Sequence, residues 1–129
     1  MRAISIHDLD GNVLSFDLAD ILRELEPWIA GLMWRITELW CVGEATPDLE
    51  EACNTGALIE TARLSELAAG LLQTIDGKFA GYRAGASDPF VVVRAVDSGF
   101  FDVQCQDDEA IAKLETSFQN TRDITEQYR

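Results

Sequence analysis

The strongest constraint on the fold is a run of apolar, β-branched and aromatic residues near the C-terminal end of the chain. Residues 88–105 read DPFVVVRAVDSGFFDVQC, in which two strand-forming segments flank Asp97-Ser98-Gly99. Glycine after two polar residues supplies the positive-φ position of a tight turn, so this stretch predicts an antiparallel hairpin over residues 90–96 and 100–103. Consecutive valines at 91–93 are also typical of a strand buried on both faces. We expect the rest of the chain to pack around this hairpin.

The segments before the hairpin alternate between β-prone and helical patterns. Asp10-Gly11-Asn12 predicts a turn that joins strands over residues 2–8 and 13–16. Residues 34–42 alternate as a half-buried strand does, which places Trp34 and Trp40 on the same face. Helices are expected to begin at the capping residues Asp17, Thr46, Ser65 and Asp107.

The stretch that leads into the hairpin carries a helical pattern followed by spaced glycines. From Ser65 the leucine spacing predicts a helix that ends near Asp76 and Gly77. Glycines at 77, 81 and 85 then predict a loop of about a dozen residues. Loops of this length are often functional, so residues 77–87 are one candidate for binding a small ligand.

Together these patterns predict an α+β domain. We expect a mixed or antiparallel sheet of four to five strands, with three to four helices packed mainly on one face. Residues 1–120 are expected to form a single globular domain, because a chain of 129 residues buries enough surface for one core. Residues 121–129 are polar and lack an apolar repeat, so we expect a frayed C-terminal tail there.

Charge is the most distinctive feature of the composition. The chain has 10 basic and 23 acidic residues and a net charge of −13. Such a surface repels nucleic acid phosphates and anionic lipids, which disfavours nucleic-acid and membrane binding and favours a basic protein partner. No apolar run approaches the length of about 20 residues that spans a bilayer, and no signal-peptide pattern is visible, so we expect a cytoplasmic protein.

The acidic residues are concentrated near the predicted hairpin, between Arg94 and Lys113. An exposed aromatic residue beside such acids would serve as an anchor for a protein partner. The predicted interaction site therefore consists of Asp97, Asp102, Asp107, Asp108, Glu109 and Trp40. The alternative is that the charge only makes the protein soluble.

The N-terminal segment ISIHDLDGN, residues 4–12, is the sharpest local motif. It resembles the first motif of the haloacid-dehalogenase-like phosphohydrolases, in which a strand ends in Asp-x-Asp-Gly-Thr; Asn12 stands in place of the threonine. The resemblance covers only this nonapeptide. It implies a Mg²⁺-dependent phosphohydrolase in which Asp8 is the nucleophile and Asp10 the general acid and base. The alternative is a plain turn, because β-prone residues follow Gly11 as they would in a hairpin.

No other residues suggest catalysis, a metal or a cofactor. The three cysteines at 41, 53 and 105 are too widely spaced for a disulfide framework or a zinc site, and we expect them to be reduced. The leading hypothesis is a non-enzymatic, bacterial-type binding protein, such as an immunity protein that blocks a basic toxin. The alternatives are a small-ligand or phosphohydrolase-like domain. Self-association through an exposed strand is left open by the sequence.

Overall fold

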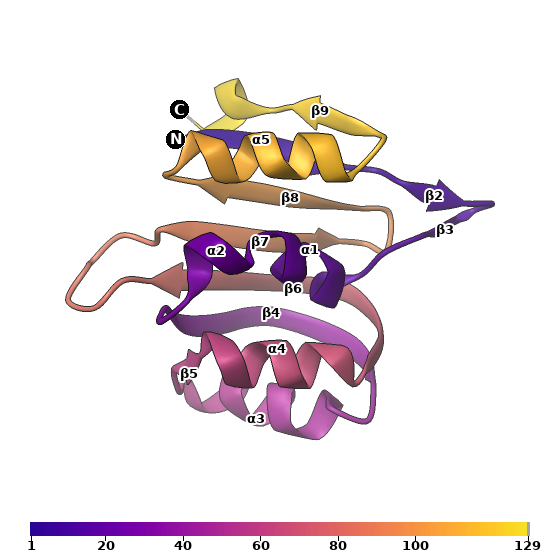
Figure 1. The fold of residues 1–129 in the computed structure, drawn as a ribbon. Helices are drawn as coiled ribbons and strands as arrows, with labels where there is room; N and C mark the ends of the chain where they lie inside the picture. Colours follow the sequence, from indigo (N-terminus) through magenta and orange to yellow (C-terminus); the bar gives the residue numbers. More distant parts are fainter. Residues whose placement is uncertain (129) are drawn as a thin grey trace.

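The computed structural model describes residues 1–128 and shows an α+β fold with a large antiparallel sheet (Figure 1). Its strands are β1 (Arg2–Ile6), β4 (Met33–Gly43), β5 (Ile59–Glu60), β6 (Leu71–Tyr82), β7 (Val91–Val96), β8 (Phe100–Cys105) and β9 (Thr121–Asp123). Their order is β5-β4-β6-β7-β8-β1-β9. The predicted α+β class and antiparallel pairing are confirmed. The sheet has seven strands within the described residues, more than the four to five expected.

The predicted hairpin is formed by β7 and β8, and β7 is the middle strand of the sheet. The hairpin is buried on its core-facing side, where Val93 of β7 and Val103 of β8 have no exposed surface. The turn differs from the prediction, because Asp97 and Ser98 take the positive φ angles, 48° and 58°. Gly99 instead donates its N–H to the Val96 carbonyl at 2.9 Å, which closes the turn.

Within residues 1–128 five α-helices accompany the sheet, where three to four were predicted. They are α1 (Leu18–Glu24), α2 (Glu26–Ile29), α3 (Thr46–Thr55), α4 (Thr61–Ala69) and α5 (Asp108–Ser117). Figure 1 shows α1, α2, α4 and α5 in front of the sheet, while α3 lies beyond β4. Their inward residues and one face of the sheet form a single core cluster. Helices therefore cover one face of the sheet, and we call the other its open face.

The prediction that Trp34 and Trp40 share a strand face is wrong. Glu38 takes a positive φ of 56°, and the pairing of β4 with β6 shifts register between Thr37 and Trp40. A bulge of this kind reverses the alternation of side chains beyond it. Trp34 is consequently in the core with no exposed surface, whereas Trp40 lies on the open face and is 62% exposed.

The predicted helix over residues 65–76 and the glycine-marked loop after it are also corrected. Helix α4 ends before Gly70, and the chain continues at once as the long strand β6. Gly77 and Gly81 lie within this strand, where a Cβ at Gly81 would come within 3.0 Å of the Trp34 ring. These glycines make room for core aromatic rings and do not form a loop. The actual connection to β7 covers only residues 83–90.

The two ends of the chain differ from expectation as well. The predicted turn near Gly11 is present, but it joins two short strands, β2 (Leu9–Asp10) and β3 (Val13–Leu14), that form a separate hairpin. Strand β1 instead pairs with β8 and β9. The segment expected to fray contains β9 and a 3₁₀ turn, η1 (Thr125–Tyr128), which is held to β1 by hydrogen bonds between Ala3 and residues 124–125.

Candidate functional site

The open face of the sheet carries a continuous row of polar side chains. Strand alternation puts Val93 and Val103 in the core, so their neighbours Arg94 and Asp102 face the other way. Directly paired residues extend this row across six strands. In order from β4 to β9, the polar row consists of Thr37, Lys78, Arg94, Asp102, Ser5 and Arg122.

Cations on this face differ from most other cations in forming no ion pair among the described residues, although Arg94 is opposite Asp102 and acts on it electrostatically. Most basic residues elsewhere form ion pairs, such as Arg2 with Glu115 at 2.9 Å. The others so paired are Arg23, Arg63 and Lys113. In contrast, no ion pair within residues 1–128 involves the open-face cations Arg35, Lys78, Arg94 and Arg122. Among the described residues, the open face therefore carries a group of cations that form no ion pair.

Asp102, one of the predicted interaction residues, lies at the centre of the polar row. Tyr128 of η1 donates its hydroxyl to Asp102 Oδ2 at 2.9 Å. Asp102 Oδ1 and Arg94 Nε are buried and have no hydrogen-bond partner among the described residues. A cavity of about 10 Å³ beside them is large enough for one water molecule. Burial raises the pKa of Asp102, while the Tyr128 hydroxyl and the charge of Arg94 oppose that shift.

Ser5 and His7 form a hydrogen-bonded pair at the β1 end of the same row. The distance from His7 Nε2 to Ser5 Oγ is 2.7 Å, and the imidazole stacks on Phe100 with 5.0 Å between ring centroids. Burial and the charge of Arg122 lower the pKa of His7, which favours the neutral ring. A neutral histidine next to a serine is the minimum for an activated nucleophile. Ser5, however, is only 4% exposed, so its hydroxyl is not accessible to a substrate.

The structure separates the predicted acidic interaction residues. Asp107, Asp108 and Glu109 lie together at the start of α5, where Asp107 Oδ1 accepts the Glu109 N–H at 2.9 Å. Asp97 lies in the turn at the opposite end of β8. A strand of this length extends about 20 Å. Since Asp102 is on the open face between the two ends, the five acids do not form one continuous patch.

Trp40 and Asp97, by contrast, come together at one end of the sheet. Trp40 is paired across the strands with Asp76, and the Asp97 N–H donates to Asp76 Oδ1 at 2.9 Å. The exposed indole is therefore next to Asp76, whose carboxylate holds the backbone of Asp97. We call Trp40, Asp76 and Asp97 the acidic end of the open face. Asp76 was not among the predicted interaction residues, because only the cross-strand pairing brings it beside Trp40.

The two aspartates of the phosphohydrolase-like motif have different surroundings. The Asp8 carboxylate accepts backbone N–H groups of Gln119 and Asn120 at 2.9 and 2.7 Å, and so connects the start of the chain to the end of α5. Asp10 lies in the exposed strand β2. Within residues 1–128 no group of three histidine, cysteine or acidic side chains is placed to hold a metal. The local geometry gives Asp8 a structural role.

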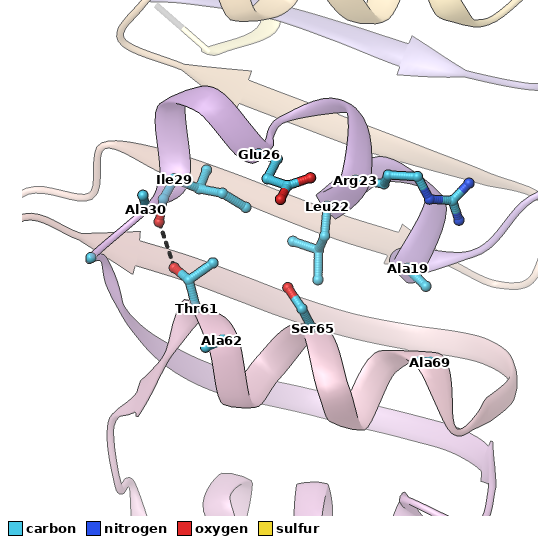
Figure 2. Close-up of a pocket in the computed structure, with 11 residues that line it drawn as sticks. Ala19, Leu22, Arg23, Glu26, Ile29, Ala30, Thr61, Ala62, Ser65 and Ala69 are labelled. Carbon is cyan, nitrogen blue, oxygen red and sulfur yellow. Dashed lines mark hydrogen bonds between the residues drawn. The ribbon is translucent and has the colours of Figure 1, made fainter.

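A groove between α1 and α2 on one side and α4 on the other is shown in Figure 2. It has a volume of about 510 Å³, and Thr61 closes one end by donating to the Ile29 carbonyl at 2.5 Å and accepting from the Trp34 indole at 2.8 Å. Arg23 points away in this view, so Glu26 and Ser65 are the polar side chains facing its middle. Most of the lining residues are apolar: Ala19, Leu22, Ile29, Ala30, Gly31, Ala62 and Ala69. The groove has the size of a small-ligand site but no set of groups for acid–base chemistry.

The loop predicted as a ligand site packs against neighbouring parts of the structure. Arg83 lies over the Phe90 ring at 4.2 Å, and the Phe90 N–H donates to the Gly81 carbonyl at 2.8 Å. Residues of this loop do not line the groove of Figure 2. A small ligand would therefore find room between the helices and not at residues 77–87.

Comparisons place no known protein beside this one. No protein-family model, no curated protein and no solved structure matches the chain. In addition, none of the helices within residues 1–128 has the length and apolar character needed to cross a membrane. The geometry of the open face is accordingly the main guide to function.

Proposed function

We propose that this protein is a non-enzymatic, cytoplasmic binding domain that docks a basic protein partner through the acidic end of its open face. The observation that carries the proposal is the 62% exposure of Trp40 beside Asp76 and Asp97. Large aromatic side chains are usually buried in a folded domain or at an interface. An exposed indole beside acidic residues suits a partner surface that offers an apolar pocket with basic residues at its rim.

The physical roles of these groups in binding are distinct. Burying the Trp40 indole in a partner would supply most of the affinity, as aromatic anchors do at the centre of interfaces. Asp76 and Asp97 would select for lysine and arginine around the anchor. The net charge of −13 would attract a basic partner from a distance and raise the association rate at low salt. An inhibitor or immunity protein that blocks a basic toxin is the most concrete form of this function.

The test is affinity capture from the native host with the wild-type protein and with Trp40→Ala. We expect a basic partner that is retained at low salt and weakened at moderate salt. Trp40→Ala should weaken binding by about 30-fold, which corresponds to a hot-spot loss of about 2 kcal/mol.

Leu58→Ala provides the matched control, because Leu58 is 46% exposed and precedes β5, which pairs with the Trp34 end of β4. This variant also loses an exposed apolar side chain, but away from the acidic end, and should bind as the wild type does. Recovery of no salt-sensitive partner, or equal binding by Trp40→Ala and the wild type, would count against the proposal.

A further inference from the structure

We infer that the centre of the open face is a second recognition site, which binds a short acidic segment of a protein through Arg35, Lys78 and Arg94. This site is distinct from the acidic end at Trp40 and takes a ligand of the opposite charge. Two observations support it: strand pairing brings these cations close together, and none of them forms an ion pair among residues 1–128.

Strand pairing determines how close the cations are. Lys78 and Arg94 are directly opposite each other on β6 and β7. Arg35 is paired with Ala80, two residues along β6 from Lys78, and so lies on the diagonal. Directly opposite side chains have Cβ atoms about 5 Å apart and diagonal ones about 7–8 Å. A single carboxylate above Lys78 is thus within reach of all three cationic side chains.

The arrangement is unfavourable in the free protein. Like charges directly opposite each other in a sheet destabilise it, and Lys78 and Arg94 are such a pair. Asp102, which is opposite Arg94 on its other side, offsets this repulsion only in part, because its Oδ2 accepts from Tyr128. The chain has 23 acidic residues, yet none forms an ion pair with these cations within the described residues. A carboxylate bound above Lys78 would relieve the repulsion between the opposed cations, while the buried Arg94 Nε faces the water-sized cavity that it shares with Asp102.

The dimensions and surrounding charge favour an acidic peptide segment over nucleic acid. The cluster extends from β4 to β7, which is two strand spacings or about 10 Å. About three residues of an extended chain span that distance. Acids at both ends of the strands, Asp97 at one and Asp107 and Asp108 at the other, would repel the continuous phosphates of a longer polyanion. A short segment with two or three carboxylates would contact the cations without reaching the acidic residues at either end of the strands.

Binding to this site should depend on salt in an unusual way. At low ionic strength the net charge of −13 repels any acidic peptide. At about 0.15 M the Debye length is about 8 Å, so distant charges are screened while contacts within the cluster persist. Affinity should therefore rise from low to intermediate salt and fall again at high salt.

The experiment titrates the isotope-labelled full chain with a hexaglutamate peptide at about 0.15 M ionic strength and follows backbone amide shifts. We expect shifts confined to β4, β6 and β7, and binding at least tenfold weaker in Arg35→Gln and in Lys78→Gln. Both side chains are at least partly exposed, so these variants should fold. Arg63→Gln is the control, because it removes a cation of α4 that is paired with Asp48.

A hexathymidylate oligonucleotide serves as the second probe. The inference is overturned if hexaglutamate does not bind, if Arg63→Gln weakens it as much as Lys78→Gln, or if the oligonucleotide binds more tightly than the peptide. None of these outcomes bears on docking at Trp40, which is measured with a basic partner. The two proposals can therefore fail separately.

Discussion

At the scale of single residues, His7 is the most informative side chain, because it is the only histidine in the chain. Its pKa is lowered chiefly by burial and secondarily by the charge of Arg122. As pH falls, the unfolded chain takes up a proton at this position before the folded protein does. The stability that the neutral ring contributes is therefore present above the usual histidine pKa of about 6.5 and is lost as pH falls from there to the folded pKa.

We predict that the wild type loses stability relative to His7→Gln between about pH 7.5 and pH 5.5, over which an ordinary histidine titrates. Urea unfolding at both pH values measures this difference. The comparison with the variant is needed because burial raises the pKa values of Asp17 and Asp102, and those groups favour the folded state as pH falls. An NMR titration of the single imidazole should also show its pKa rising toward the usual value in Arg122→Gln. A wild-type pKa at or above the usual value would contradict this account.

At the scale of elements, β6 shows how glycine adapts a strand to a crowded core. A Cβ on Gly81 would lie 3.0 Å from Trp34 Cε2 and 3.1 Å from Leu32 Cδ1. Both neighbours are themselves buried and cannot move without disturbing the packing around them. The absence of a side chain at this position is therefore what allows the Trp34 indole to reach Thr61.

We expect Gly81→Ala to lower the free energy of unfolding by about 1–3 kcal/mol, as overpacking usually does. Gly99→Ala is the matched control, since a Cβ there would meet nothing closer than the Val96 carbonyl oxygen at 3.7 Å. It should change stability by less than about 0.5 kcal/mol. Urea midpoints with unchanged m-values provide the measurement. Equal effects of the two substitutions on the free energy of unfolding would show that the close approach of Trp34 to Gly81 does not exclude a side chain there.

At the scale of the whole molecule, excess negative charge opposes the compact state. The net charge of −13 is spread over a chain of 129 residues. Its surface ion pairs, such as Arg23 with Asp20, are largely solvent-exposed and contribute little. Self-repulsion among the unpaired acids should consequently dominate the response of stability to salt.

We predict that the melting temperature rises when NaCl is increased from about 0.02 M to about 0.2 M. The Debye length shortens over this range, so repulsion between distant acidic residues is screened. The double substitution Glu44→Gln and Glu51→Gln removes two charges on and near α3 and should reduce this rise. Differential scanning calorimetry measures both quantities. A melting temperature that falls with salt would mean that ion pairs outweigh the repulsion.

The elements that the sequence predicted correctly are those with local causes. The β7–β8 hairpin follows from strand-forming residues around a turn, and α1 begins where Asp17 donates its N–H to Asp20 Oδ2 at 2.8 Å. Both involve residues close together in the chain. The helical pattern predicted beyond Gly70 is wrong because pairing with β4 overrides a weak local preference over the first part of β6.

The candidate sites required the tertiary structure. Lys78 opposite Arg94, and Trp40 beside Asp76, are brought together by strand register, and one bulge at Glu38 determines which face Trp40 occupies. Register between distant strands depends on how all the core side chains pack together, and a one-residue slip moves every side chain to the other face. The sequence alone therefore determined the acidity of this protein and its central hairpin. Which charges and aromatic rings meet on one surface was decided only by the packing of the whole chain.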